Sequence, residues 1–157
     1  MTVDRLVERE SREAECRTHE IPLGQPAQDG DLPEVDGVDD ESRERLAVRY
    51  GHAARGVLEL AAERPELRRR IVPDLPDLLA EALFAAGHEQ ALSLADVLMR
   101  RTRLGLLAAP DLTVPDAEAP RVVAEAMAPE LGWDAARVDE ELRDWRDLAV
   151  AEGIAQR

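Results

Sequence analysis

Charged side chains interrupt the most ordered apolar pattern of the chain, which runs from Pro76 to Leu104. Five of them occupy positions where a helix would normally bury carbon: Glu81, Glu89, Asp96, Arg100 and Arg101. Carboxylate and guanidinium groups at such positions can pair with one another inside a helical core. Alternatively, they can form a site that acts on a molecule outside the chain. The spacing alone leaves both interpretations open.

The arginines at the end of this stretch, Arg100, Arg101 and Arg103, could bind an anion. Few aromatic residues accompany them to stack on bases, which disfavours nucleic acid as the ligand. Asp96 and Arg100 are four residues apart and can pair on one helical face. We expect at least one arginine to be buried against an acid of the same stretch. A second basic run, Arg68 to Arg70, is interpreted as solvated surface.

Other chemistry finds little support in the residue pattern. The three histidines, His19, His52 and His88, lie in three separate segments, so no zinc-protease spacing is present. Cys16 is the only cysteine, which rules out an internal disulfide, and acidic neighbours disfavour its thiolate. No serine has nucleophile-elbow surroundings, and no glycine-rich phosphate loop is found. We therefore predict no catalytic, cofactor-binding or metal-binding residue in this chain.

Composition favours helices and an acidic surface. Apolar residues make up 45% of the 157 residues, and only 3% are aromatic, which is a poor supply for strands. The net charge is -14, from 34 acids against 20 bases, and all the bases are arginine. Such a surface repels nucleic acid and anionic membranes. No apolar run approaches the roughly 20 residues that span a bilayer, and no signal peptide is visible, so we expect a cytoplasmic protein.

The central stretch is predicted to form two helices that position the charged residues. Asp74, Pro76 and Asp77 are compatible with a helix start, and Gly87 is expected to interrupt this first helix. Ser93 and Asp96 match a capping box, so a second helix should begin at Leu94.

The rest of the chain is predicted to be helical apart from its connections. Periodicity and caps indicate these elements: an amphipathic helix at 2–14, an extended acidic linker at 16–40, helices at 41–50 and 53–63, a further turn at 66–71, a loop at 104–119, a helix at 120–131 ended by Gly132-Trp133, and a last helix after Asp134. The predicted fold class is all-α: a compact bundle of five or six helices preceded by an N-terminal helix and a long acidic linker.

Several short motifs in order resemble a known family. They are Arg49-Tyr50-Gly51, Ala80-Glu81, His88-Glu89, Asp96-Val97-Leu98, Arg100-Arg101-Thr102-Arg103-Leu104 and Leu131-Gly132-Trp133. This series resembles the C-terminal helical domain of FAD-dependent glycerol-3-phosphate dehydrogenase and of the related α-glycerophosphate oxidase. The resemblance covers about residues 41 to 150. The stretch from Cys16 to Leu23 is similar to the segment that joins the flavin domain to this cap.

The resemblance implies a division of the chain and a function for its parent. Residues 1–40 would be a remnant helix and linker from the preceding flavin domain, and residues 41–157 would be the C-terminal helical cap domain. The parent enzyme oxidises glycerol 3-phosphate to dihydroxyacetone phosphate; FAD takes the hydride and passes the electrons to a quinone or to oxygen. The glycine motif that binds FAD is absent here. No cofactor is therefore expected in this chain, although the parent uses FAD.

Six residues on or beside the family motifs are inferred to have structural or domain-contact roles rather than catalytic ones: Glu81, Glu89, Asp96, Arg100, Arg101 and Arg103. The expected partner is the enzyme's own flavin domain, and the isolated cap should be inactive. Homo-oligomer formation and peripheral attachment of the parent to the inner face of the membrane, through a quinone acceptor, stay open. So do two alternatives: a free-standing helical interaction module, and a small-anion-binding domain that uses the three arginines.

Overall fold

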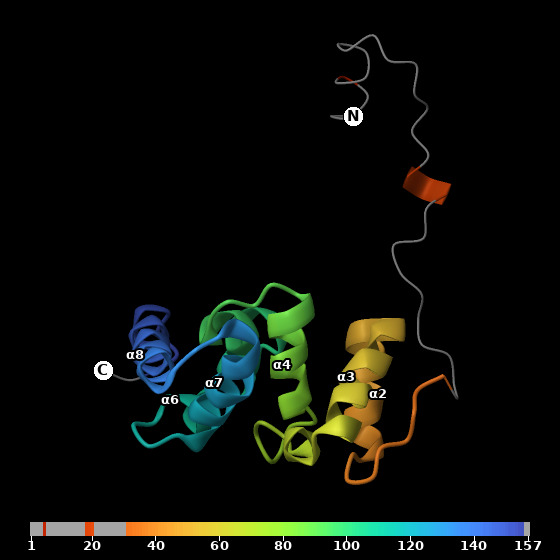
Figure 1. Cartoon of the computed structure of the whole chain (residues 1–157). Coiled ribbons are helices and arrows are strands. Elements are labelled where there is room, and N and C mark those ends of the chain that lie inside the picture. Colours follow the sequence, from red (N-terminus) through yellow and green to blue (C-terminus); the bar gives the residue numbers. More distant parts are fainter. Residues whose placement is uncertain (1–4, 6–17, 21–30, 156–157) are drawn as a thin grey trace.

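The computed structural model describes residues 5, 18–20 and 31–155 (Figure 1). The predicted helix at 2–14, apart from Arg5, lies outside the described residues, as do residues 16–17 and 21–30 of the predicted linker. Within the described part of the chain, no helix is both long and apolar enough to cross a membrane.

The described residues contain seven α-helices and no strand, which confirms the all-α prediction. The α-helices are α2 (Asp40–Tyr50), α3 (Ala54–Glu63), α4 (Leu79–His88), α5 (Leu104–Leu107), α6 (Ala109–Thr113), α7 (Glu118–Leu131) and α8 (Ala135–Ala151). Three 3-10 helices, η1 (Thr18–Glu20), η2 (Gly51–Ala53) and η3 (Pro65–Arg68), and one π-helix, η4 (Asp96–Arg101), complete the described elements.

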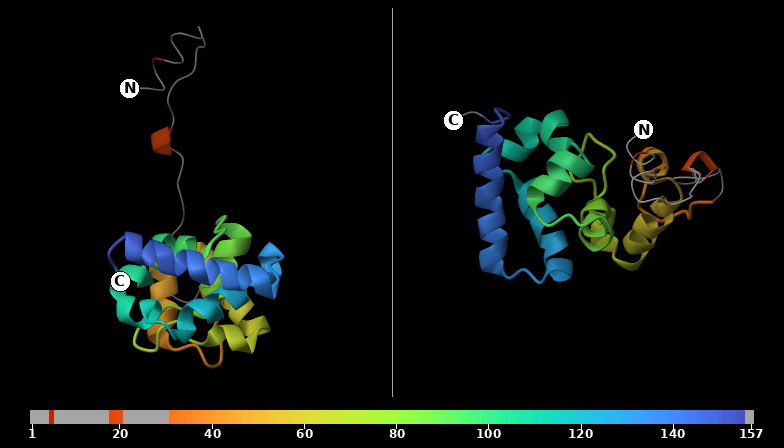
Figure 2. Two further views of the ribbon diagram at one scale, coloured as in Figure 1. Left: turned by 90° about the vertical axis from the view of Figure 1, so that its left-hand side faces the viewer. Right: turned by 90° about the horizontal axis from the view of Figure 1, so that it is seen from above.

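Helix α4 lies at the centre of the bundle (Figure 1). It packs on α3 at one side and on α7 at the other. Helix α2 packs on α3, and α8 packs on α7, so that α2 and α8 lie at opposite edges of the bundle (Figure 2). Every residue from Leu79 to Ala86 is buried. A helix that is apolar on all sides must be enclosed by its neighbours, which is the position that α4 takes.

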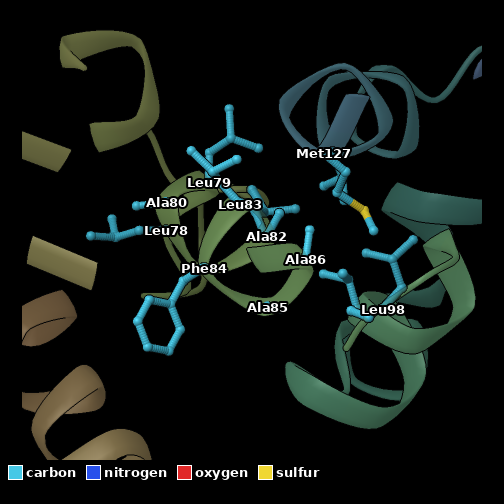
Figure 3. Close-up of a cluster of buried hydrophobic side chains, with 14 of the residues drawn as sticks. Leu78, Leu79, Ala80, Ala82, Leu83, Phe84, Ala85, Ala86, Leu98 and Met127 are labelled. Atoms are coloured by element: carbon cyan, nitrogen blue, oxygen red, sulfur yellow. The ribbon is translucent and has the colours of Figure 1, made fainter. Parts of the chain in front are cut away.

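Small residues on α4 let its neighbours approach closely, while its few large side chains fill the remaining space (Figure 3). Met127 of α7 lies near Ala86 on one side, whereas Phe84 points to the other side. Phe84 meets the edge of the Tyr50 ring at a centroid distance of 5.5 Å and lies against Gly56 of α3. Around α4 the core is therefore mainly aliphatic, with one aromatic contact between α4 and the α2–α3 pair.

Side-chain caps begin α2 and α8, and the helix boundaries predicted at Gly132 and Asp134 are confirmed. Asp39 accepts a hydrogen bond from Ser42 N at 2.8 Å and begins α2, and Asp134 does the same for α8 through Arg137 N. Gly132 ends α7 in the left-handed conformation, with φ of 65°. The next residue, Trp133, then donates its N–H to Ala128 O at 3.0 Å.

Three predictions about boundaries were wrong. Gly87 does not interrupt α4, which runs to His88; the chain turns instead at Gln90, where φ is 56°. The helix does not start at Asp77, because the Glu81 side chain accepts the N–H of Leu78 and sets the start there.

The predicted loop at 104–119 contains the short helices α5 and α6. Pro110 fits there because it lies in the first turn of α6, where its missing N–H costs nothing.

Candidate functional site

The best-defined polar group of the structure is the Arg49 cluster, which consists of Arg49, Asp77 and Glu81. Arg49 comes from the last turn of α2, Asp77 from the loop before α4, and Glu81 from the first turn of α4. Arg49 Nη2 lies 2.6 Å from Asp77 Oδ1, and Arg49 Nη1 donates to Glu81 Oε2. One guanidinium therefore pairs with two carboxylates.

The Arg49 cluster also holds backbone groups in place. Arg49 Nη2 donates to Thr102 O at 3.4 Å, and Glu81 Oε1 accepts from Leu78 N at 2.8 Å. The cluster thus connects α2, the start of α4 and the residue that follows η4. These elements are up to 53 residues apart in sequence, so the cluster fixes their relative positions.

Burial determines the electrostatics of the cluster. The Glu81 side chain is fully buried, that of Asp77 is 2% exposed, and that of Arg49 is 18% exposed. Burial raises the pKa of Glu81, and the neighbouring Asp77 adds to this effect against the opposing Arg49. Burial also disfavours the charge of Arg49, but the two carboxylates outweigh it and raise the pKa of Arg49. The one guanidinium is shared by both carboxylates, so the cluster leaves no positive charge free for an outside anion.

Tyr50 lies beside the cluster and contributes no reactive group. Burial, followed by the charges of Glu81 and Glu89, raises the pKa of the Tyr50 phenol well above its ordinary value. The hydroxyl is enclosed and has no hydrogen-bond partner in the described structure. Its ring packs on Phe84, which in turn stacks on His88 at a centroid distance of 4.5 Å. A phenol held neutral in this way cannot act as a base at neutral pH.

The other acidic candidates lie in separate places. Glu89, at the end of α4, pairs with Arg101: Arg101 Nε lies 3.4 Å from Glu89 Oε2, and Arg101 Nη2 donates to Glu89 O at 2.6 Å. Asp96 accepts from Leu92 N and from Ser93 Oγ, at 3.0 and 2.9 Å. These bonds and the Arg100 pair lower the pKa of Asp96 despite its partial burial, which opposes the shift.

The three arginines of the predicted anion site do not converge. Arg100 pairs with Asp96, as the four-residue spacing predicts, and Arg101 pairs with Glu89. Arg103 is exposed and makes no side-chain hydrogen bond or ion pair within the described residues. The arginine that reaches the fully buried acid, Glu81, is Arg49 and not one of these three. The arrangement therefore offers no shared anion site.

Helix α8 supplies two polar contacts that sequence reasoning missed. Glu141 is 3% exposed, accepts the N–H of Leu94 at 2.9 Å and pairs with Arg137. Trp145 Nε1 donates to Leu112 O at 2.8 Å. Both contacts bridge segments more than 30 residues apart, so no local pattern could have indicated them. They attach the start of the η4 segment and α6 to α8.

The surface of the described residues has several shallow hollows. A cleft of about 420 Å³ lies among η3, α4 and α7. Two oppositely charged residues at its wall, Arg69 and Glu118, already pair at 3.1 Å. No group of three or more His, Cys, Asp or Glu residues in the described part of the chain could hold a metal ion.

Comparison with known proteins finds one matching protein family and several related enzymes. A family model described as the C-terminal domain of alpha-glycerophosphate oxidase matches residues 16–138. Over 111 residues, the chain is 37% identical to glycerol-3-phosphate dehydrogenase 2 of Mycobacterium tuberculosis (strain ATCC 25618 / H37Rv) and 39% identical to glycerol-3-phosphate dehydrogenase of Mycobacterium leprae (strain TN). Each match covers 71% of this chain and 18% of the relative.

A third relative, glycerol-3-phosphate dehydrogenase 1 of Mycobacterium tuberculosis (strain ATCC 25618 / H37Rv), is 40% identical over 101 residues. This match covers 63% of the chain and 19% of the relative. The chain thus spans about a fifth of the length of the curated relatives that it matches. No solved structure matches the chain.

Proposed function

The chain belongs to the family of the C-terminal domain of alpha-glycerophosphate oxidase, and on this premise we propose that it is the C-terminal helical cap domain of an FAD-dependent glycerol-3-phosphate dehydrogenase. The parent enzyme would oxidise glycerol 3-phosphate to dihydroxyacetone phosphate. In this proposal residues 41–157 form the cap, and residues 1–40 belong to the connection with the preceding flavin domain.

The observation that carries the proposal is the partial coverage of the relatives. Three relatives named as glycerol-3-phosphate dehydrogenases match this chain over only 18–19% of their length. The family model, by its description, covers a C-terminal domain. A chain that corresponds to one end of a much longer enzyme is best explained as an accessory domain.

The described residues do not fit an FAD site. The charged groups of the Arg49 cluster are buried and paired, and no glycine-rich turn leads into a helix N-terminus to hold a pyrophosphate. We therefore assign FAD to the preceding domain of the parent. The six candidates, Glu81, Glu89, Asp96, Arg100, Arg101 and Arg103, are proposed to shape the cap or its domain contact.

Two measurements on the purified 157-residue chain test this proposal. We expect no visible flavin absorption after purification, and no reduction of a dye acceptor when glycerol 3-phosphate is added. Stoichiometric bound flavin, or turnover by the chain alone, would refute the accessory role. A positive control is the complete dehydrogenase 2 of Mycobacterium tuberculosis, assayed with the same dye.

The alternative, a free-standing helical interaction module, has one observation in its favour. The adjacent side chains of Leu106 and Leu107 are 59% and 63% exposed, as a binding surface would require. Sedimentation of the chain alone separates a monomeric cap from a self-associating module.

We further propose a cytoplasmic location and peripheral membrane attachment of the parent through its quinone acceptor. Flotation of the parent with lipid vesicles would test the attachment.

A further inference from the structure

The Arg49 cluster contains one positive charge for two negative ones. Arg49 Nη2 lies 2.6 Å from Asp77 Oδ1, and Arg49 Nη1 donates to Glu81 Oε2, so a single guanidinium serves both carboxylates. The Glu81 side chain is fully buried and that of Asp77 is 2% exposed, so water screens the second negative charge very little. A buried cluster with surplus negative charge favours the uptake of a proton.

A similar arrangement on α8 shows what burial adds. Arg137 also serves two acids: its Nη1 lies 2.6 Å from Glu140 Oε2, and its Nη2 pairs with Glu141. There, however, the side chains of Arg137 and Glu140 are 39% and 51% exposed, so water and salt screen the charges. In the Arg49 cluster, the enclosed position of both acids removes this screening.

The charged residues around Glu81 do not compensate the surplus charge. Glu89, at the other end of α4, is a further acid, and its partner is Arg101. The remaining charged or titratable residues on α4 and on the neighbouring elements are exposed or bonded elsewhere: Asp40, Glu41, Arg43, Glu44 and Arg45 on α2, Arg55, Glu59 and Glu63 on α3, Glu66 and Arg68 on η3, Asp74 in the loop before α4, His88 on α4, Asp96 and Arg100 on η4, and Glu118, Arg121, Glu125 and Glu130 on α7. Both buried acids therefore depend on Arg49.

Tyr50 offers an acceptor for a proton carried by Glu81. Glu81 Oε1 accepts the N–H of Leu78 at 2.8 Å, so the proton would bind at Oε2, the oxygen that now accepts from Arg49. The Tyr50 hydroxyl is enclosed and has no hydrogen-bond partner among the described residues. The charge of Glu81 acts on this phenol more strongly than that of Glu89. Its oxygen can accept a hydrogen bond from a neutral carboxyl group.

We infer that the contact between Glu81 and Arg49 is controlled by a proton. The ionised Glu81 holds Arg49 and so joins α4 to α2. In mildly acidic solution Glu81 Oε2 takes a proton from the solvent and donates it in a hydrogen bond to the Tyr50 hydroxyl, while Arg49 stays paired with Asp77. The surplus negative charge then disappears, and one of the two links between α2 and the α4 region opens. This inference does not depend on the proposed function.

The electrostatics of Glu81 agree with this arrangement. Burial raises the pKa of Glu81, Arg49 opposes the shift, and Asp77 adds to it. A pKa that is higher in the folded than in the unfolded state means that the folded chain binds the proton first. The contribution of Glu81 to stability therefore rises as the pH falls from the folded-state pKa toward the ordinary 4.5.

Carbon-13 NMR of the 157-residue chain, labelled at the glutamate carboxyl groups, tests the inference directly. The Glu81 signal is assigned by its loss in Glu81→Gln. We expect it to titrate above the ordinary glutamate pKa of 4.5. The side-chain Nε–H signal of Arg49, assigned by its loss in Arg49→Lys, should shift with the same midpoint. A Glu81 carboxylate that stays ionised down to pH 4.5, or an Arg49 signal that does not respond, would overturn the inference.

Urea unfolding gives a second readout. Glu81→Gln cannot take up the proton. Between the Glu81 midpoint and pH 4.5, the unfolding equilibrium constant of the unchanged chain should therefore fall relative to that of Glu81→Gln, by up to about tenfold per pH unit. A ratio that is the same at every pH would contradict proton uptake by the folded state.

Three variants separate the shared guanidinium from burial alone. Asp77→Asn leaves Arg49 to Glu81, so the Glu81 midpoint should fall. Tyr50→Phe removes the acceptor of the proton and should lower the midpoint as well. Glu140→Gln, which removes an acid from the exposed Arg137 pair, is the matched control and should leave the midpoint unchanged. An unchanged midpoint in Asp77→Asn, or an unchanged or raised one in Tyr50→Phe, would overturn the contact proposed here.

Discussion

Arg49 is the residue on which the polar interior depends. Asp77 and Glu81 are both buried, and Arg49 is the cation that pairs with each of them. A buried ion pair contributes little net stability, because desolvation offsets the attraction between the charges. Loss of one partner is costly, however, since the other charge is then left unpaired in a medium of low polarity.

We therefore expect Arg49→Ala to lower the free energy of unfolding by about 3–5 kcal/mol, as is usual when a buried pair loses one member. The measurement is urea denaturation followed by circular dichroism at neutral pH. Arg100→Ala is the matched control: its ion pair with Asp96 involves a side chain that is 65% exposed, so the change should stay within about 0.5 kcal/mol. Equal effects of the two substitutions would show that the Arg49 cluster is solvated.

Asp39 gives a pH-dependent prediction at the surface. Its hydrogen bonds with Arg70, and next with Ser42 N, lower the pKa of its carboxyl below the ordinary 3.8. A lowered pKa in the folded state stabilises the fold above pH 3.8, and this contribution is lost as the pH falls through the folded-state pKa.

Asp39→Asn isolates this charge effect, because asparagine still caps a helix. The Asp39 side chain is 54% exposed, so at pH 7 we expect a loss of only about 0.5 kcal/mol. Urea denaturation of both proteins between pH 2 and 7 measures the difference, which should shrink toward zero at the acid end. A difference that is independent of pH would mean that capping geometry, and not charge, separates the two proteins.

At the scale of elements, local sequence signals predicted the helices whose apolar residues recur at helical spacing and whose ends carry capping residues. In α3, Ala54, Val57, Leu58 and Ala61 recur at three- and four-residue spacing in the sequence, and all four are buried. In α8, Val138, Leu142, Trp145 and Ala149 recur at the same kind of spacing and are buried as well. Periodicity and caps are encoded within a few residues, so a single sequence suffices to locate them.

Contacts between distant segments could not be predicted in this way. Glu81 was singled out by its place in an apolar run, but its partner Arg49 lies 32 residues away. The π-helical course of η4 also escaped prediction. At the end of η4, Thr102 N donates to Val97 O, five residues back. Just before η4, Leu94 donates its N–H to Glu141 of α8. Tertiary contacts of this kind override local preference, and no spacing rule reveals them.

Two glycines, Gly105 and Gly87, also differ in whether distant segments press on them, and they yield a paired prediction. In Gly105, an added Cβ would lie 2.5 Å from Met99 Sδ and 2.9 Å from the Trp145 ring. In Gly87, within α4, the nearest atoms belong to the flexible end of Glu130, at 3.3 Å. We expect Gly105→Ala to cost about 1–3 kcal/mol through overpacking. Gly87→Ala should raise stability by up to about 1 kcal/mol, because alanine loses less entropy in a helix.

Thermal and urea unfolding of the two variants check this pair, with each protein compared to the unchanged chain. The sign of the difference matters more than its size, because helix propensity alone would stabilise both variants. A stabilised Gly105→Ala variant would therefore show that α5 does not press on Trp145 as the structure indicates.

For the whole molecule, the position of α4 decides how stability is distributed. It packs between α3 and α7, so that neither of these two helices can leave the bundle without exposing it. Helices α5 and α6 have only four and five residues. Short helices open by local fluctuations, whereas an enclosed helix exchanges its amides only when the whole fold opens.

Native-state hydrogen exchange of the isolated chain should therefore show two levels of protection. Amides in the middle of α4, around Leu83, are expected to exchange with the free energy of global unfolding and to respond to urea as global unfolding does. Amides of α5 should exchange faster, with little dependence on urea, because little surface is exposed when a single short helix opens. If α4 exchanged by a urea-independent route while α8 stayed protected, the bundle would consist of two halves that open separately. The Arg49 cluster, which joins α2 to the start of α4 and the end of η4, would then have failed to unite them.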